Sequence, residues 1–169
     1  HLGPATSPGV AGPLRTDWSH MYSFTSRVRY SEIDENGVLG IPALVDYLQD
    51  CSTFQSESLG LGPAHIASTG LAWLLSAWKI EIAELPRFND EIRVSTWATG
   101  FSGLRASRNF TVCRADDEDG ARPLVRADSS WFMFDANKGR PVRTPEAESA
   151  PYLADAHDDA PLDLPAIPR

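Results

Sequence analysis

Residues 30–60 read YSEIDENGVLGIPALVDYLQDCSTFQSESLG, and this stretch decides the fold. From Ile41 onward, apolar and small side chains recur at intervals of three and four residues, at Ile41, Leu44, Val45, Leu48, Cys51, Ser52, Gln55 and Leu59. This spacing predicts an amphipathic helix with one buried face. Pro42 fits the first turn of that helix, and Gly60 fits its end. No later stretch has a comparable helical period, so we expect one principal helix with a sheet built around it.

The segments on either side of this helix have the pattern of half-buried strands. Residues 22–30 alternate between apolar and polar side chains, and strand-like runs follow at 71–85, 91–99, 97–115 and 123–136. We expect a turn at Gly100 to Gly103 and a short helical turn at Ala64 to Ser68. The order of one long helix followed by several strands with short loops predicts an α+β protein with a helix packed on an antiparallel sheet.

Composition excludes several classes of function. The net charge is −8, which argues against a nucleic-acid partner. No apolar run approaches the roughly 20 residues that a membrane span requires, so we expect no membrane partner. Cys51 and Cys113 lie far apart in the sequence, as free thiols in a reducing compartment do, and we expect a cytoplasmic protein. The four histidines have no metal-ligand spacing, and we expect neither a metal nor a cofactor.

The two ends of the chain differ in composition from its middle. Residues 1–20 are rich in Pro, Gly, Ser and Thr and are predicted to be a disordered arm or leader. Residues 144–169 are dense in Pro, Ala and Asp and are predicted to be an extended linker or tail. The folded domain is therefore expected at residues 21–143.

Three separated blocks resemble one family. Residues 27–50 (RVRYSEIDENGVLGIPALVDYLQD), 71–99 (LAWLLSAWKIEIAELPRFNDEIRVSTWAT) and 129–147 (SSWFMFDANKGRPVRTPEA) resemble, in order, the N-terminal half of the bacterial and plant acyl-acyl-carrier-protein (acyl-ACP) thioesterases. The resemblance implies a hotdog fold, an antiparallel sheet wrapped around one long central helix. Family members carry two such domains in tandem, whereas this chain has one. It is either a fragment of a two-hotdog protein or a single-hotdog relative, which we expect to form a homodimer.

The resemblance also implies where the catalytic residues lie. In this family an Asp-x-Asn-x-His motif stands at the turn before the helix of the second hotdog, and a glutamate from the following strand completes it. In the equivalent turn of this chain, Asp34 and Asn36 match the motif and Val38 stands in place of the His. Glu84 is the nearest candidate for the glutamate. The turn also resembles that of hydroxybenzoyl-CoA-type thioesterases, in which an Asp acts without the His.

The residues of this turn suit thioester hydrolysis. Asp34 could act as base or nucleophile, Asn36 could orient water, and backbone N–H groups from Val38 to Ile41 could receive the thioester oxygen. The alternative is a structural role, since Asp-x-Asn-Gly is a common turn sequence and Asp or Asn often caps a helix.

Other residues are candidates for binding substrate. Gln55 is polar but lies on the apolar helix face, so it could face a cleft or a partner subunit. Trp73 and Trp78 could line an acyl channel, or they could simply pack in the core or at a dimer interface. Five arginines, at positions 105, 108, 114, 122 and 126, could dock an acidic carrier protein or lie on solvated strand faces.

Taken together, the resemblance implies hydrolysis of fatty acyl-ACP or acyl-CoA to free fatty acid and thiol, without a cofactor. One alternative is a non-catalytic hotdog half that supports a catalytic partner domain. Another is a hotdog dehydratase, but this would need a His paired with Asp or Glu near the helix start, where the sequence has none.

Overall fold

The computed structural model describes residues 21–156 and 160–165. The predicted arm or leader, residues 1–20, lies outside the described residues, as do parts of the predicted tail. The elements in chain order are β1 (Tyr22–Arg27), η1 (Tyr30–Glu32), α1 (Ile41–Ser58), α2 (Pro63–Thr69), β2 (Leu71–Ile82), β3 (Glu91–Ser102), β4 (Arg105–Arg114), β5 (Val125–Asp135), β6 (Arg140–Val142) and α3 (Glu146–Asp155). None of the described helices is both long and apolar enough to cross a membrane.

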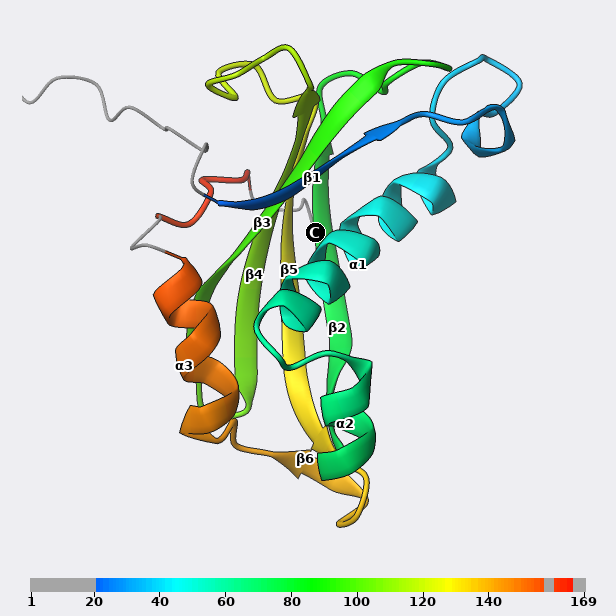
Figure 1. Cartoon of the computed structure of the whole chain (residues 1–169). Coiled ribbons are helices and arrows are strands. Elements are labelled where there is room, and N and C mark those ends of the chain that lie inside the picture. Colours follow the sequence, from blue (N-terminus) through cyan, green and yellow to red (C-terminus); the bar gives the residue numbers. More distant parts are fainter. Residues whose placement is uncertain (1–20, 157–159, 166–169) are drawn as a thin grey trace, which may run out of the picture.

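The strands form one antiparallel sheet. Its order is β1-β3-β4-β5-β2, and the short β6 pairs with β5. Helix α1 crosses one face of this sheet, which curves around it (Figure 1). Strands β1 and β2 lie at the two edges, so β2 has no hydrogen-bonded neighbour beyond β5 among the described strands. The predicted hotdog fold, a sheet wrapped around one long helix, is confirmed.

The core lies between α1 and the sheet. Leu44, Leu48 and Cys51 are fully buried and pack in one cluster with Val94 and Phe110 from the central strands. These helix positions belong to the stripe predicted from the sequence, and the helix begins at Ile41 with Pro42 in its first turn, as expected. Gly60 follows the helix with a φ of 74°, a conformation that favours glycine.

The turn between β3 and β4 lies later than the sequence predicts. Strand β3 continues through Gly100, which pairs with Ser107, and the turn falls at Gly103 and Leu104. A register shift between Ala98 and Gly100 interrupts the alternation there, and such a bulge lets a strand continue past a glycine. Gly103 has a φ of 63°, which a two-residue hairpin turn requires.

The prediction of an extended segment from residue 144 is wrong for its first part. Residues 146–155 form helix α3, which packs beside β3 (Figure 1). Two acidic residues, Glu146 and Glu148, stand in its first turn, where they favour the helix N-terminus. Tyr152 anchors this helix, because its side chain is only 1% exposed. The prediction failed because composition does not reveal these tertiary contacts.

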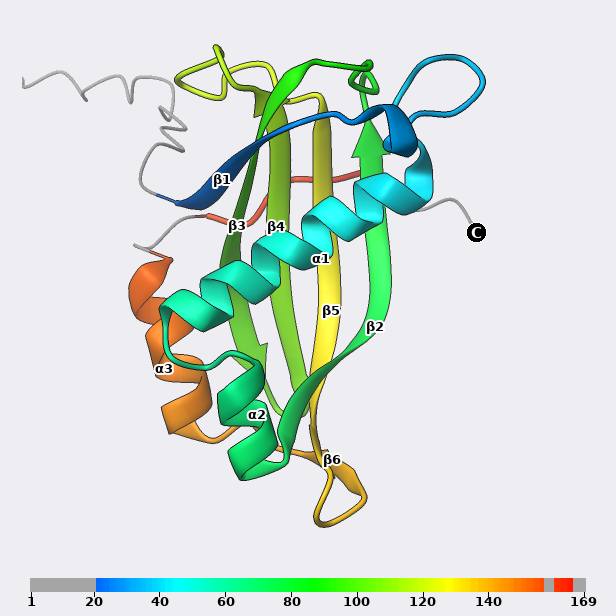
Figure 2. The same ribbon diagram turned by 45° about the vertical axis from the view of Figure 1, so that its right-hand side comes forward.

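Residues 160–165 cross the face of the sheet that is remote from α1 (Figure 2). The Trp97 indole donates to the Ala160 carbonyl at 3.3 Å, and the Leu162 amide donates to Asn109 Oδ1 at 2.7 Å. Lys79 Nζ on β2 then donates to the Leu164 carbonyl at 3.3 Å. The chain therefore passes over the outer face from β3 to the edge strand β2.

Replacing a buried side chain of α1 should destabilise the whole domain. Leu44 is fully buried, whereas Ile41 on the same helix is 48% exposed. We expect Leu44→Ala to lower the free energy of unfolding by about 2–5 kcal/mol, because it leaves a cavity under α1. Ile41→Ala should change it by less than about 1 kcal/mol. Urea denaturation measures both, and equal losses would contradict the proposed core.

Candidate active site and acyl pocket

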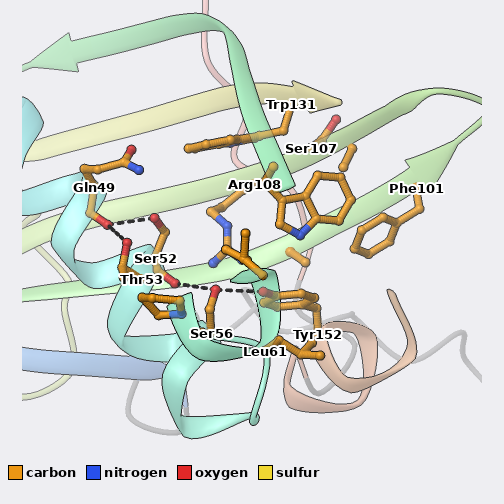
Figure 3. A pocket seen from close by; sticks show the side chains of 16 residues that line it. Gln49, Ser52, Thr53, Ser56, Leu61, Phe101, Ser107, Arg108, Trp131 and Tyr152 are labelled. Atoms are coloured by element: carbon orange, nitrogen blue, oxygen red, sulfur yellow. Dashed lines mark hydrogen bonds between the residues drawn. The ribbon is translucent and has the colours of Figure 1, made fainter. Parts of the chain in front are cut away.

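A pocket of about 110 Å³ lies between the C-terminal half of α1, α2, α3 and the inner face of the sheet (Figure 3). Its α1 wall is polar and comes from Gln49, Ser52, Thr53 and Ser56. The facing walls are largely aromatic and come from Trp73, Phe101, Trp131 and Tyr152. Side chains from four strands and three helices thus meet in a space that has one polar and one apolar side.

Arg108 lines this pocket, although it is only 8% exposed. Its Nη1 donates to Gln55 Oε1 and, at 3.0 Å, to Thr96 Oγ1. Its guanidinium carbon lies 5.1 Å from the centre of the Tyr152 ring, within the range of a cation–π interaction. Burial lowers the pKa of the Arg108 guanidinium, while the nearby Tyr152, Cys51 and Asp155 oppose that shift.

Gln55 connects Arg108 to α3. Its Nε2 donates to Asp155 Oδ2 at 2.6 Å, while its Oε1 accepts from the guanidinium. The expectation that Gln55 lies on the buried helix face is confirmed, since its exposure is 0%. It does not line the pocket itself, but it holds the arginine that does.

Helix α3 closes one end of the pocket. The Tyr152 and Ser56 hydroxyls are hydrogen-bonded at 2.7 Å. His65 Nε2 on α2 lies 2.7 Å from Glu148 Oε1 on α3. His65 stands in α2, which covers the short helical turn predicted at Ala64 to Ser68, and it joins α2 to α3. These contacts tie α1, α2 and α3 together around the pocket.

Asp34 lies in the turn before α1, where its carboxylate serves the turn itself. Oδ1 accepts the backbone N–H of Asn36 at 2.8 Å and that of Val38 at 3.4 Å. Asn36 is exposed. The next N–H groups are also occupied, because Leu39 donates to the Pro86 carbonyl and Gly40 to the Glu32 carbonyl. Of the expected oxyanion donors, Val38, Leu39 and Gly40 therefore already have acceptors.

The structure does not join Glu84 to this turn. Glu84 is exposed and pairs with Arg114 at 3.1 Å, and within the described part of the chain it makes no hydrogen bond or ion pair with Asp34. The pocket lies elsewhere on α1, since its first α1 residue is Gln49, roughly two turns past the helix start. Asp34, Asn36 and Glu84 are thus not brought together with the pocket, and their catalytic roles stay predictions.

The two tryptophans proposed to line an acyl channel have different places. Trp73 lines the pocket and lies 5.8 Å from the Phe101 ring centre. Trp78 instead packs against Phe110 in the core, with ring centres 5.3 Å apart, and is not a pocket residue. Its indole N–H is buried without an acceptor among the described residues.

The other reactive groups are occupied or inert. Burial raises the pKa of the Cys51 thiol to about 12 and that of Cys113 to about 11, so neither is a nucleophile near neutral pH. No group of three or more His, Cys, Asp or Glu within residues 21–156 and 160–165 could hold a metal ion. The five arginines do not form one docking patch, because Arg108 is buried, Arg114 pairs with Glu84 and Asp90, and Arg126 pairs with Glu81.

Solved structures of other proteins share this fold, and a thioesterase is among them. An oleoyl thioesterase assigned in Lactobacillus plantarum is 26% identical, with a TM-score of 0.75, and the match covers 88% of this chain and 55% of that one. A Staphylococcus aureus protein solved with CoA is 14% identical, which shows the fold alone; its TM-score is 0.75 and 96% of it is covered. The fold is thus that of the hotdog thioesterases.

The sequence comparisons give the family. The model of the acyl-ACP thioesterase N-terminal domain matches residues 19–152, and the chain belongs to this family. A chloroplastic acyl-ACP hydrolase of Cuphea viscosissima is 26% identical over 138 residues, which are 76% of this chain and 33% of that protein. The chain therefore spans about a third of this curated relative.

Sequence reasoning missed Arg108 and Tyr152 as site residues. Arg108 has the same strand parity as Phe110 and Val112, which are buried against α1, so alternation along residues 105–114 could have placed it inside. Tyr152 gave no such signal, because it lies in a segment whose composition indicated a linker.

The bridge from α1 to Arg108 should be important for stability. We expect Gln55→Ala to lower the free energy of unfolding by about 2–4 kcal/mol, because it leaves a buried guanidinium and Asp155 without their shared partner. Gln49→Ala, an exposed position on the same helix, is the control and should have little effect. If thermal and urea denaturation showed no difference between the two variants, the bridge would not contribute to stability.

Proposed function

We propose that this chain acts in the hydrolysis of fatty acyl thioesters, releasing a free fatty acid and the thiol of acyl-carrier protein or coenzyme A. Membership of the acyl-ACP thioesterase N-terminal domain family supports this reaction class. The observation that carries the proposal is the aromatic-walled pocket between α1 and the sheet, where the apolar part of an acyl group fits.

In the first form of the proposal the chain itself is catalytic. Asp34 takes a proton from water, which adds to the thioester carbonyl, and Asn36 orients the water. The carbon–sulfur bond then breaks, the carbonyl re-forms as a carboxylic acid, and the thiolate leaves and takes up a proton. Glu84 is the third candidate. Asp34 is partly exposed in its turn. Its contacts with the turn use Oδ1, and the other carboxylate oxygen, Oδ2, accepts no hydrogen bond among the described residues.

A second form makes this domain the acyl-holding half of a larger catalyst. It is favoured by Val38 in place of the family His, by the turn contacts of Asp34, and by the separation of Asp34 from the pocket. In this form the chemistry belongs to a second hotdog domain, and the present domain supplies the pocket.

The variant Asp34→Asn separates the two forms. The amide keeps an oxygen for the N–H groups of Asn36 and Val38, so the turn should stay folded, but it cannot act as a base. For the first form we expect the chain to hydrolyse acyl-CoA or acyl-ACP substrates, with at least a ~100-fold loss of turnover in Asp34→Asn. A thiol-trapping dye follows the reaction.

Asp46→Asn is the matched control, because this exposed carboxylate on α1 lies outside the turn and should not affect turnover. Equal turnover in Asp34→Asn and the unaltered chain would remove Asp34 from catalysis. A folded chain that hydrolyses no acyl thioester would favour the second form.

Strand β2 is an edge of the sheet, which supports the proposal that a second hotdog unit pairs with it. If that unit is a second copy of this chain, the result is a homodimer. Leu74 and Leu75 on β2 are 41% and 39% exposed, and an unpaired apolar edge favours association. We expect sedimentation to give a dimer, and Leu75→Lys to shift it toward monomer. A monomer for the unaltered chain at high concentration would contradict the proposal. Leu104→Lys is the control, because Leu104 is exposed at a hairpin turn, and this variant should remain a dimer.

A further inference from the structure

Arg108 is a buried cation in a pocket with aromatic walls. Its residue exposure is only 8%, yet it lines the space between Ser52, Ser56, Trp131 and Tyr152 (Figure 3). A buried charge is costly unless it is paired. An arginine in such a place therefore needs an explanation.

The charge of Arg108 has no direct counterion. No ion pair joins it to a carboxylate within the described part of the chain, and its two protein acceptors are the neutral oxygens of Gln55 and Thr96. The Asp155 carboxylate also acts on the guanidinium electrostatically, but it accepts a hydrogen bond from Gln55 rather than from Arg108. The pocket thus contains an incompletely neutralised positive charge.

One side of the guanidinium is open. Both protein bonds use Nη1, so Nε and Nη2 have no acceptor among residues 21–156 and 160–165. Among the described residues, the fully shielded polar atoms without a partner are Trp78 Nε1 and Thr144 Oγ1. Since Nε and Nη2 of Arg108 have no acceptor and are not in this group, both atoms remain accessible. Nε and Nη2 together form the side of an arginine that binds the two oxygens of a carboxylate.

The size and walls of the pocket limit the body of the ligand. At about 110 Å³ the space is somewhat smaller than the roughly 150 Å³ cavity that admits benzene in an engineered protein. The rings of Trp73, Phe101 and Trp131 offer flat apolar contact. A short alkyl group fits within this volume, and a ring or a longer body would extend beyond it.

We propose that this pocket binds a carboxylate on a short apolar body, with Nε and Nη2 of Arg108 donating to the two carboxylate oxygens. The inference rests on the proposed function in taking this pocket as the one that receives the acyl group. The carboxylate has two possible sources, which are the far end of a dicarboxylic acyl chain and a free acid.

A pair of ligands tests the charge requirement on the unaltered chain. Benzoate and benzamide have nearly the same shape, but only benzoate is an anion. Binding to the full 169-residue chain can be followed by calorimetry and by the fluorescence of the pocket tryptophans. We expect benzoate to bind at least about tenfold more tightly than benzamide. Equal affinities, or no binding of benzoate, would overturn the proposal.

A pair of variants on strand β4 assigns the effect to Arg108. Arg108→Gln should lower benzoate affinity at least about tenfold and leave benzamide affinity unchanged. Arg105→Gln removes an exposed charge three residues earlier and should leave both affinities unchanged. If Arg105→Gln lowers benzoate affinity as much as Arg108→Gln, the pocket is not the binding site. If Arg108→Gln fails to fold, the ligand pair on the unaltered chain still decides.

Two thioesters of equal length distinguish the sources. Adipoyl-CoA ends in a carboxylate and hexanoyl-CoA ends in a methyl group. At least tenfold tighter binding of adipoyl-CoA, lost in Arg108→Gln, supports the acyl-chain source. Equal binding of the two, with benzoate still bound through Arg108, supports the free-acid source. These readouts measure binding, so a chain that hydrolyses no thioester would remove only the first, catalytic form of the proposed function and would not affect this inference.

Discussion

The packing of α1 on the inner face of the sheet is the contact on which the rest of the structure depends. Leu44, Leu48 and Cys51 lose all solvent exposure against the central strands. Since burial of this stripe fixes the rotation of the helix, Gln55, one turn after Cys51, is also turned inward. A polar group is therefore carried into the interior, where it meets Arg108. The pocket lies beside this meeting point, so core packing and site geometry are set by the same helix.

Helix α3 completes what α1 begins. Asp155 accepts the hydrogen bond from the Gln55 side-chain N–H group. Tyr152 places its ring against the Arg108 guanidinium and its hydroxyl is hydrogen-bonded to Ser56. Without α3, the buried Arg108 guanidinium would lose the Tyr152 ring that lies over it. The segment that follows then crosses the outer face toward β2, the edge at which a second hotdog unit is proposed to pair. The C-terminal part of the described chain therefore does two things: α3 forms one wall of the pocket, and residues 160–165 lead toward β2.

Local patterns were enough to predict the elements whose signals are local. The period of α1 predicted its bounds and most of its buried face, although Ile41 of the predicted stripe is 48% exposed, and alternation predicted β1. The turn after Ala98 was misplaced because a bulge depends on the neighbouring strand, which the sequence of one strand does not reveal. Helix α3 was missed because its stability comes from Tyr152 and Glu148 in contact with distant residues.

For the site, Gln55 was singled out as a polar residue on an apolar stripe, whereas Arg108 was grouped with exposed arginines. The parity of β4 distinguishes Arg108 from Arg105, whereas Arg114 shares that parity but lies at the end of the strand.

The most direct test of the central claim, that the acyl group lies between α1 and the sheet, is a crystal structure of this chain with a non-hydrolysable thioether analogue of a short acyl-CoA. The predicted result is an acyl chain within the pocket, in contact with Trp73 and Trp131 and close to Arg108. An acyl chain bound elsewhere, on the outer face of the sheet or along the exposed edge of β2, would contradict that claim.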